Sequence, residues 1–386
     1  MKTINKKTKV TLLLLSTITV LSNVAIVTMI PNLSTIFKDI ENIELLSRLM
    51  ITLPSLSIAI FAPFLGIFVN SVGKKKSVLI ALLAFSLFGT SGLYLNNIYE
   101  ILVSRFLFGI SIAILMIVNT TLIGDYFKNE DRNKFIGLQS AFISIGGIFF
   151  IISGGFLSDI SWRYPFAIYS LAIFLYIFVV KYLVEYNSNS MEIKEERHLL
   201  NNNLWYIYFF AFIFMLVFYI LPTQMPFLII NVFHANGVLA GGIIATAFIF
   251  NALGGLSFVK LKKHFTFSKI YMIGMSIVAI GFILIGFISN VYLFFLTSPI
   301  IGFGGGILMA NMTTWMLHVS HHTKRVKSSS FLTSSLFLGQ FFSPLVTHPV
   351  LNYFGVQDFF IAIGVILLSI IFVTILSKIV QTCINM

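Results

Sequence analysis

Long apolar segments alternate with short polar ones along the whole chain of 386 residues. Each apolar segment has about the 20 residues that a helix needs to cross a hydrocarbon layer roughly 30 Å thick. Helices are required because lipid offers no partner to an unpaired backbone group. The pattern predicts twelve spanning helices, at residues 9–30, 46–69, 77–95, 99–122, 135–157, 163–184, 204–226, 238–259, 267–288, 291–315, 329–350 and 358–380.

The longest polar break is EYNSNSMEIKEERHLLNNN, from Glu185 to Asn203, and it divides the twelve segments into six and six. We interpret it as a solvated cytoplasmic linker. The predicted domains are an N-terminal six-helix bundle at residues 1–184, the linker at 185–203 and a C-terminal six-helix bundle at 204–386.

The two halves also resemble each other in sequence. GISIAILMIVNTT begins at Gly109 and GFGGGILMANMTT begins at Gly302, 193 residues later, and the same offset pairs Gly146 with Gly339. Parallel six-helix repeats are typical of transporters whose halves rock around a central site. The expected fold class is therefore an all-α membrane protein with two pseudo-symmetric bundles of six transmembrane helices.

Composition supports the bilayer as the solvent, since 58% of the residues are hydrophobic and only 10% are charged. Soluble domains carry about 25% charged residues. The net charge of +12 does not indicate nucleic acid, because most lysines and arginines fall in alternate loops. The positive-inside rule then predicts that both termini are cytoplasmic. The apolar run near the N-terminus is expected to be a retained first helix.

Chemistry-bearing motifs are scarce. The single cysteine, Cys383, excludes an internal disulfide framework. The sequence contains no phosphate-cradling loop, nucleophile elbow or metalloprotease motif. We expect no enzyme activity, no cofactor and no metal site.

The charge that stands out is Arg105, inside the apolar stretch EILVSRFLFGIS. An arginine at a helix centre costs about 2.5–3.5 kcal/mol on insertion scales. One interpretation is that its long side chain snorkels to the outer headgroups. The other, which we favour, is that it faces a cavity and meets a substrate or a proton-carrying partner. Arginine itself stays protonated and cannot be the carrier.

The repeated six-helix halves and the stretch around Arg105 resemble the major facilitator superfamily, in particular its twelve-helix, drug:proton antiporter-like bacterial efflux members. The fourth-helix pattern of that family fits Leu102, Arg105 and Gly109. Its fifth-helix antiporter pattern fits Gly146, Gly154 and Gly155, although Phe150 and Ile151 stand where Gly-Pro is expected. The resemblance implies a major facilitator fold and a role for Arg105 in proton coupling.

The family's conformational latch, a loop between helices two and three, corresponds to Gly66, Asn70, Gly73 and Lys74. Asn70 and Ser71 replace its acid and arginine. In this fold Asp125, at the inner end of the fourth span, is close to the loop, so we include it in the predicted latch.

Four further polar or aromatic residues are candidates for substrate or coupling contacts. Asn23, Gln224 and Asn311 lie on helices one, seven and ten, which line the cavity in the superfamily, and Trp315 could stack on a substrate. For the amides the alternative is ordinary helix–helix hydrogen bonding, and for Trp315 it is an interfacial anchor.

The predicted function is a secondary transporter of the bacterial inner membrane that works by alternating access and exports a small amphipathic, drug-like or metabolite substrate. The proton is a candidate coupling ion, although none of the thirteen acidic residues lies in the middle of a span. The alternatives are a facilitator or importer of a small organic solute and, from another class, a non-transporting receptor or scaffold. We expect a monomer that contacts membrane lipid and binds no nucleic acid.

Overall fold

The computed structural model describes residues 5–127, 129–183, 203–321 and 325–384, and every regular element in these ranges is a helix. The first half of the chain forms α1 (Lys6–Val24), η1 (Val27–Met29), α2 (Ile30–Ile36), α3 (Ile43–Val72), α4 (Lys74–Gly89), η2 (Thr90–Leu93), α5 (Ile98–Tyr126), α6 (Asn129–Ile160), η3 (Tyr164–Ser170) and α7 (Leu171–Tyr182). The second half forms α8 (Asn203–Phe218), α9 (Ile220–Phe227), η4 (Leu228–Val232), α10 (Gly237–His264), α11 (Phe267–Gly286), η5 (Val291–Leu293), α12 (Phe294–Val319), α13 (Arg325–Phe354) and α14 (Val356–Ile384).

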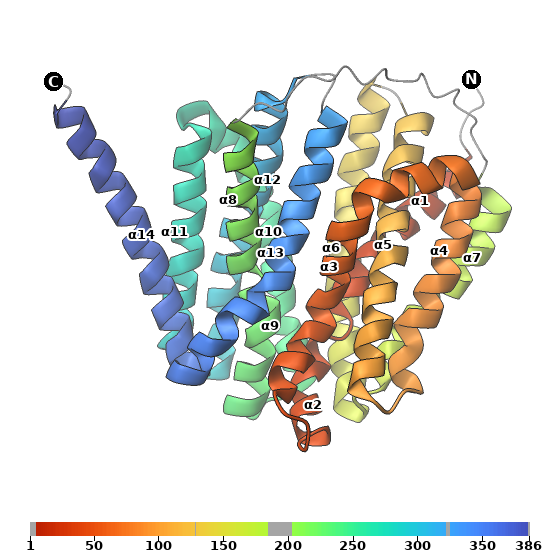
Figure 1. Cartoon of the computed structure of the whole chain (residues 1–386), viewed down its shortest axis with the longest axis horizontal. Helices are drawn as coiled ribbons and strands as arrows, with labels where there is room; N and C mark the ends of the chain where they lie inside the picture. Colours follow the sequence, from red (N-terminus) through yellow and green to blue (C-terminus); the bar gives the residue numbers. More distant parts are fainter. Residues whose placement is uncertain (1–4, 128, 184–202, 322–324, 385–386) are drawn as a thin grey trace.

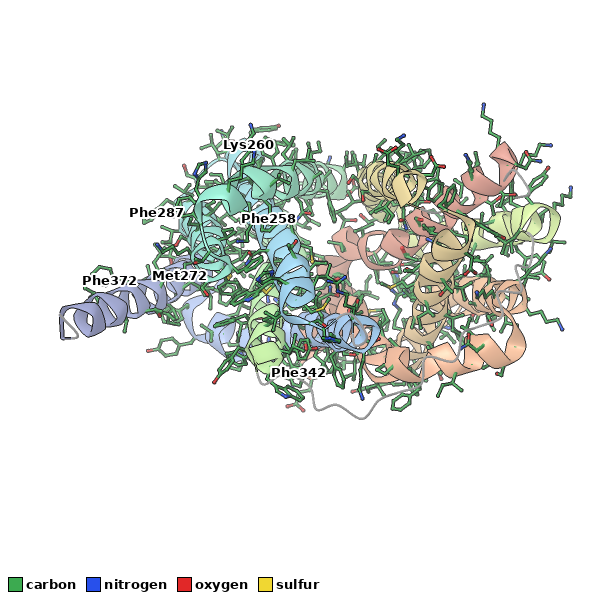
Figure 2. All side chains as sticks on the ribbon, turned by 90° about the horizontal axis from the view of Figure 1, so that it is seen from above. Phe258, Lys260, Met272, Phe287, Phe342 and Phe372 are labelled. Atoms are coloured by element: carbon green, nitrogen blue, oxygen red, sulfur yellow. The ribbon has the colours of Figure 1, made fainter. Side chains whose placement is uncertain are left out.

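The helices form an elongated bundle in which α1 begins and α14 ends at the same end, the top of Figure 1. The α3–α4 junction and the end of α10 lie at this end too, and they carry Lys74, Lys75, Lys76, Lys260, Lys262 and Lys263. We call it the basic end. Viewed along the bundle, the first and second halves occupy separate sides, and Phe287 and Phe372 lie on the periphery of the second half (Figure 2).

Ten helices of the described residues are long and apolar enough to cross a membrane. The two other predicted spans correspond to α1 with η1 and α2, and to α13, which contains many hydroxyl and amide side chains. The first span is not one continuous helix, because α1 stops at Val24 and the chain continues through η1 into α2. The twelve-helix, all-α fold class is thereby confirmed. The predicted linker lies outside the described residues except for Asn203, so the domain boundaries stay a prediction.

Glycines set the closest helix contacts, and they do so in the same way in both halves. A Cβ on Gly109 of α5 would overlap the carbonyl oxygen of Pro54 in α3. A Cβ on Gly302 of α12 would overlap the carbonyl oxygen of Ala247 in α10. The offset of 193 residues that separates the two glycines also separates Pro54 from Ala247. The two halves, which resemble each other in sequence, therefore also share an equivalent close contact between a glycine and the backbone of a neighbouring helix.

The halves meet along two seams. In one, α3 packs against α13, where Ser55 donates to Gln340 Oε1 at 2.8 Å and Ser334 donates to the carbonyl of Ala59 at 3.1 Å. In the other, α6 packs against α10, and a Cβ on Gly155 would overlap the backbone of Gly237. The seams join helices far apart in sequence through polar and backbone contacts.

We expect Gly302→Ala and Gly109→Ala to destabilise the protein although alanine favours helices by about 1 kcal/mol. Overpacking of a close contact costs about 1–3 kcal/mol, which outweighs that gain. Gly137→Ala in α6, where no atom lies within 4 Å of an added Cβ, is the matched control and should be neutral or stabilising. Thermal unfolding of the purified variants measures the difference, and equal melting temperatures for the three variants would contradict the repeated contact.

Candidate functional site

Arg105 lies fully inside the first half, with 0% of its surface exposed, so its guanidinium does not reach the lipid surface. Its Nε donates to the carbonyl of Met50 in α3 at 3.1 Å. Its Nη2 donates to the carbonyl of Ser22 in α1 at 3.0 Å, and the hydroxyl of Tyr169 in η3 donates to the same carbonyl at 3.1 Å. The guanidinium also sits over the ring of Phe108, 4.2 Å from its centroid. One side chain thus ties α5 to α1, α3 and η3.

The two carbonyls that Arg105 binds are ones that their own helices leave without a partner. Met50 lies four residues before Pro54, and proline has no N–H to donate to it. Ser22 lies in the last turn of α1, where helical carbonyls have no intrahelical donor. A buried carbonyl left unpaired costs about 1–3 kcal/mol. Arg105 therefore supplies the missing hydrogen-bond donor both at the proline of α3 and at the end of α1.

The remaining nitrogen of Arg105 has no such partner. Nη1 is buried and makes no hydrogen bond within the described part of the chain, and no carboxylate there lies within salt-bridge distance of the guanidinium. Tyr219, from the junction of α8 and α9 in the other half, lies in the neighbourhood of the guanidinium. The positive charge thus lies near the boundary between the halves without an acidic partner.

A second buried arginine, Arg48 of α3, bridges the halves directly. Its Nε donates to Gln224 Oε1 in α9 at 2.9 Å, and its guanidinium lies over the ring of Phe227, 4.0 Å from the centroid. Its two terminal nitrogens donate to Glu44 Oε2 at 3.1 and 3.2 Å. Gln224 in turn donates to Thr347 of α13 at 3.2 Å. This network lies at the end of the bundle opposite the basic end.

The structure separates the predicted substrate residues. Gln224 belongs to the Arg48 network, whereas Asn311 donates to the carbonyl of Phe267 at 3.1 Å. Trp315 stacks on Phe267, with ring centroids 5.8 Å apart. Asn311 and Trp315 therefore join α12 to the start of α11, far from Arg105 along the bundle. The side chain of Asn23 lies outside the described part of the structure.

The predicted latch residues lie at the basic end. Lys74 Nζ donates to Asp125 Oδ2 at 2.5 Å, which joins the start of α4 to the end of α5. Gly73 between α3 and α4 has φ +92°, a conformation that favours glycine. Asn70 is exposed, and Gly66 has open space around it. The electrostatic contact at this position therefore joins Lys74 to Asp125, and its role as a latch stays a prediction.

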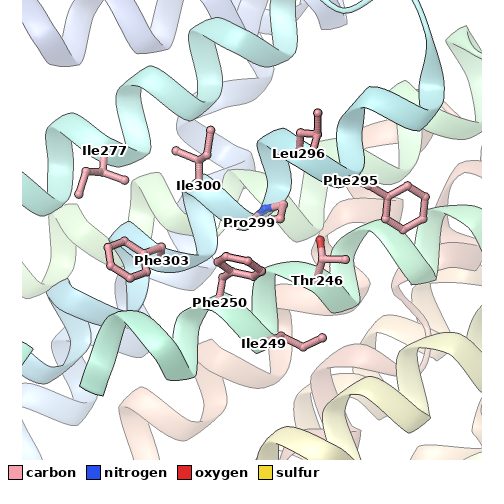
Figure 3. Close-up of a pocket in the computed structure, with 9 residues that line it drawn as sticks. All are labelled: Thr246, Ile249, Phe250, Ile277, Phe295, Leu296, Pro299, Ile300 and Phe303. Carbon is pink, nitrogen blue, oxygen red and sulfur yellow. The ribbon is translucent and has the colours of Figure 1, made fainter. Parts of the chain in front are cut away.

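An open pocket of about 630 Å³ lies on the surface of the second half, between α10, α11 and α12, and Leu296 in its lining is 67% exposed. Thr246, Phe250, Ile277, Pro299 and Phe303 are among the residues that line it (Figure 3). None of the residues predicted for substrate or coupling lines it, so it is separate from the Arg105 region.

Asp159 of α6 also contacts the other half, since its Oδ1 accepts from the backbone N–H of Gly237 in α10 at 2.6 Å. The sequence did not single out Arg48 or Asp159 as candidate functional residues. Glu44 and Arg48 have the i, i+4 spacing of a helical ion pair, which could have drawn attention to them. The contact between Arg48 and Gln224 joins residues far apart in the sequence, so the sequence pattern could not predict it.

The hydrogen bond from Arg105 to the carbonyl of Met50 can be tested with Pro54→Ala. This substitution restores a backbone N–H at residue 54, which can then donate to the Met50 carbonyl within the helix. Arg105→Ala should lower the free energy of unfolding in both backgrounds, but by about 1–2 kcal/mol less when residue 54 is alanine. Arg163→Ala is the control, because Arg163 binds the carbonyls of Gly92 and Leu95 and its loss should cost the same in both. An Arg105→Ala penalty that does not depend on Pro54 would refute the assignment.

Comparison with known proteins identifies the family. A profile described as Major Facilitator Superfamily matches residues 12–268. Multidrug resistance protein 2 of Bacillus subtilis is 31% identical over 229 residues, so the match spans 56% of each chain. Multidrug resistance protein 1 of the same bacterium is 27% identical over 358 residues, which cover 88% of this chain and 90% of the relative.

The fold agrees with that match. The crystal structure of a bacterial homologue of the human lysosomal transporter Spinster, in an inward-facing and occupied conformation, superposes with a TM-score of 0.73. It covers 90% of this chain and 82% of that chain at 18% sequence identity, so it shows the shared fold alone. The family resemblance found in the sequence motifs is confirmed, and the chain belongs to the major facilitator superfamily.

Proposed function

We propose that this protein is a secondary transporter that exports small amphipathic, drug-like molecules from a bacterial cell by alternating access. The observation that carries the proposal is the placement of the contacts between the two halves. The similarity to two multidrug resistance proteins, one of them over most of its length, supports drug-like compounds as the substrate class.

The two ends of the bundle differ in how the halves meet. Arg48 and Asp159 bind the opposite half at the end away from the basic loops. Near the basic end of α3, Phe64 and Ile67 are 66% and 73% exposed. α3 contains Pro63 and bends in its upper part (Figure 1), as helices commonly do at proline. We interpret the structure as a state that is closed at the far end and open toward the basic end.

Orientation follows from the lysines. The positive-inside rule places the basic end in the cytoplasm, so the open end faces the compartment from which an exporter collects its substrate. A cytoplasmic location of both termini and a position in the inner membrane are part of this proposal. We further propose that the protein acts as a monomer surrounded by lipid, since one chain supplies both halves.

The proton is the proposed coupling ion. Arg105 stays charged, and its unpaired Nη1 and its proximity to Tyr219 of the other half support a contact with a substrate group or a protonatable partner. The remaining proposed substrate and coupling residues are Asn23, Gln224, Asn311 and Trp315. The proposed latch consists of Gly66, Asn70, Gly73, Lys74 and Asp125.

Accumulation of a fluorescent amphipathic dye tests the proposal. Cells that produce the protein should retain less dye than matched cells without it, and collapse of the proton gradient should abolish the difference. Dye uptake that rises with the protein would support a facilitator or importer. Equal accumulation of a panel of amphipathic compounds, with protein confirmed in the membrane, would contradict export and favour a receptor or scaffold.

Arg105→Ala should leave membrane insertion intact and remove transport. Arg105→Lys keeps the charge but lacks the planar fork that serves two carbonyls at once, so its transport rate should fall at least about tenfold. Initial rates in reconstituted vesicles measure both effects, with Arg163→Lys as the control for loss of an arginine elsewhere in the first half. Unchanged rates for Arg105→Ala would exclude a role in transport.

A further inference from the structure

Asp159 makes a contact between the halves that the transport residues discussed so far do not include. It is the last residue but one of α6, in the first half. Its Oδ1 accepts a hydrogen bond from the backbone N–H of Gly237 at 2.6 Å, and its Oδ2 accepts one from the N–H of Val238 at 3.1 Å. Gly237 and Val238 are the first two residues of α10, in the second half. One half therefore caps a helix of the other.

The chemistry of this contact favours a carboxylate. The first N–H groups of a helix have no intrahelical acceptor, and the helix dipole gives its N-terminus a partial positive charge. The side-chain oxygen of Asn236, the residue before α10, accepts from the N–H of Leu239 at 2.9 Å. The two preceding N–H groups are bonded by Asp159 across the boundary. Hydrogen bonds to an ionised acceptor are about twice as strong as neutral ones.

The surrounding backbone is built for close approach at this point. A Cβ on Gly155 would overlap the carbonyl of Gly237, and a Cβ on Gly237 would overlap Ser158. Ser158 donates to the carbonyl of Gly155 at 2.8 Å and to the hydroxyl of Thr28 in η1 at 3.4 Å. α6, α10 and η1 therefore pack directly on one another, and Thr28 is fully buried among them.

We propose that Asp159 forms a second latch, separate from the proposed latch at the basic end, and that its carboxylate holds the two halves closed at the end opposite the basic loops. That end opens only when the carboxylate releases the N-terminus of α10. The Arg48–Gln224 bond joins a different pair of helices, α3 and α9, at the same end, so two separate polar contacts hold the halves together there. The inference rests on the proposed alternating-access function, because only a protein whose halves separate needs to release this contact.

The release is reversible because water can replace both partners. When the halves part, water forms hydrogen bonds with the N–H groups of α10 and with the carboxylate of Asp159. The net free energy by which the contact stabilises the closed state is therefore modest. A modest gain suits a contact that forms and breaks in every cycle. Removing it should shift the population toward the state that is open at this end.

Cysteine reactivity measures that population. Cys383 is the single cysteine of the chain, so Cys383→Ser gives a background without thiols, and Thr28→Cys places one thiol at the buried junction of α6, α10 and η1. A water-soluble maleimide is added to the protein in lipid nanodiscs, where both faces are accessible, and the labelling rate is recorded. Asp159→Ala should label about tenfold faster than the parent, the effect of losing charge-assisted hydrogen bonds. Asp159→Asn should label at an intermediate rate.

Asp358→Asn is the matched control. Asp358 is an exposed carboxylate in the first turn of α14, a helix of the same half as α10, and its substitution should leave the labelling rate unchanged. A size-exclusion profile shows whether each variant is folded, and Asp159→Asn carries the test where Asp159→Ala does not fold.

A labelling rate within about twofold of the parent for a folded Asp159 variant would overturn the latch. The result does not depend on finding a substrate. If the parent exports the dye but Asp159 variants label normally, the latch is wrong and the proposed function stands. If Asp159 variants label faster but the dye is never exported, the latch stands and the export assignment fails.

Discussion

A helix in lipid has no water to bond a carbonyl that its own backbone leaves free, and the first half of this protein depends on how that constraint is met. α1 stops inside the bundle and α3 contains a proline, so each exposes a carbonyl in the interior. Arg105 of α5 donates to both. The cost of burying an arginine is thereby offset by hydrogen bonds that the broken helices require.

The same arginine has a structural role and is the residue that we propose to take part in transport. It contacts α1, α3 and η3, and among the described residues its Nη1 has no hydrogen-bond acceptor and its guanidinium has no acidic neighbour. We propose that this donor binds a group that enters the boundary between the halves. Its bonds to two helix breaks mean that such binding would act on the backbone of both helices.

Two kinds of residue, glycines and polar side chains, form the contacts between the halves. Glycines let the backbones of α6 and α10 touch, which fixes geometry but adds little that must be broken. Polar side chains, Arg48 and Asp159, supply bonds that water can replace. Polar contacts of this kind stabilise one conformation and still permit the halves to separate, because water can take the place of each partner. A boundary made only of apolar side chains would contain no hydrogen bonds that water could replace.

Much of the fold could be predicted from the sequence because lipid imposes a simple rule on length and hydropathy. The spans followed from that rule. The repeat followed from matching residues at a constant offset, and it is visible again in the contacts of Gly109 and Gly302. The partners of Arg105 could not be predicted, because they are backbone carbonyls rather than acidic side chains. Asp159 and Glu44 lie at helix ends, where a carboxylate ordinarily faces water, and only tertiary packing reveals that Asp159 caps a helix of the other half.

We propose that the two halves close at one end while they part at the other. Distances between spin labels at Lys76 and Lys263, at the basic end, and at Lys38 and Asp358, at the opposite end, test it most directly by pulsed electron resonance in nanodiscs. Conditions that drive transport should shorten the first distance and lengthen the second within one population. Distances that change in the same direction at both ends, or at neither end while transport proceeds, would contradict it.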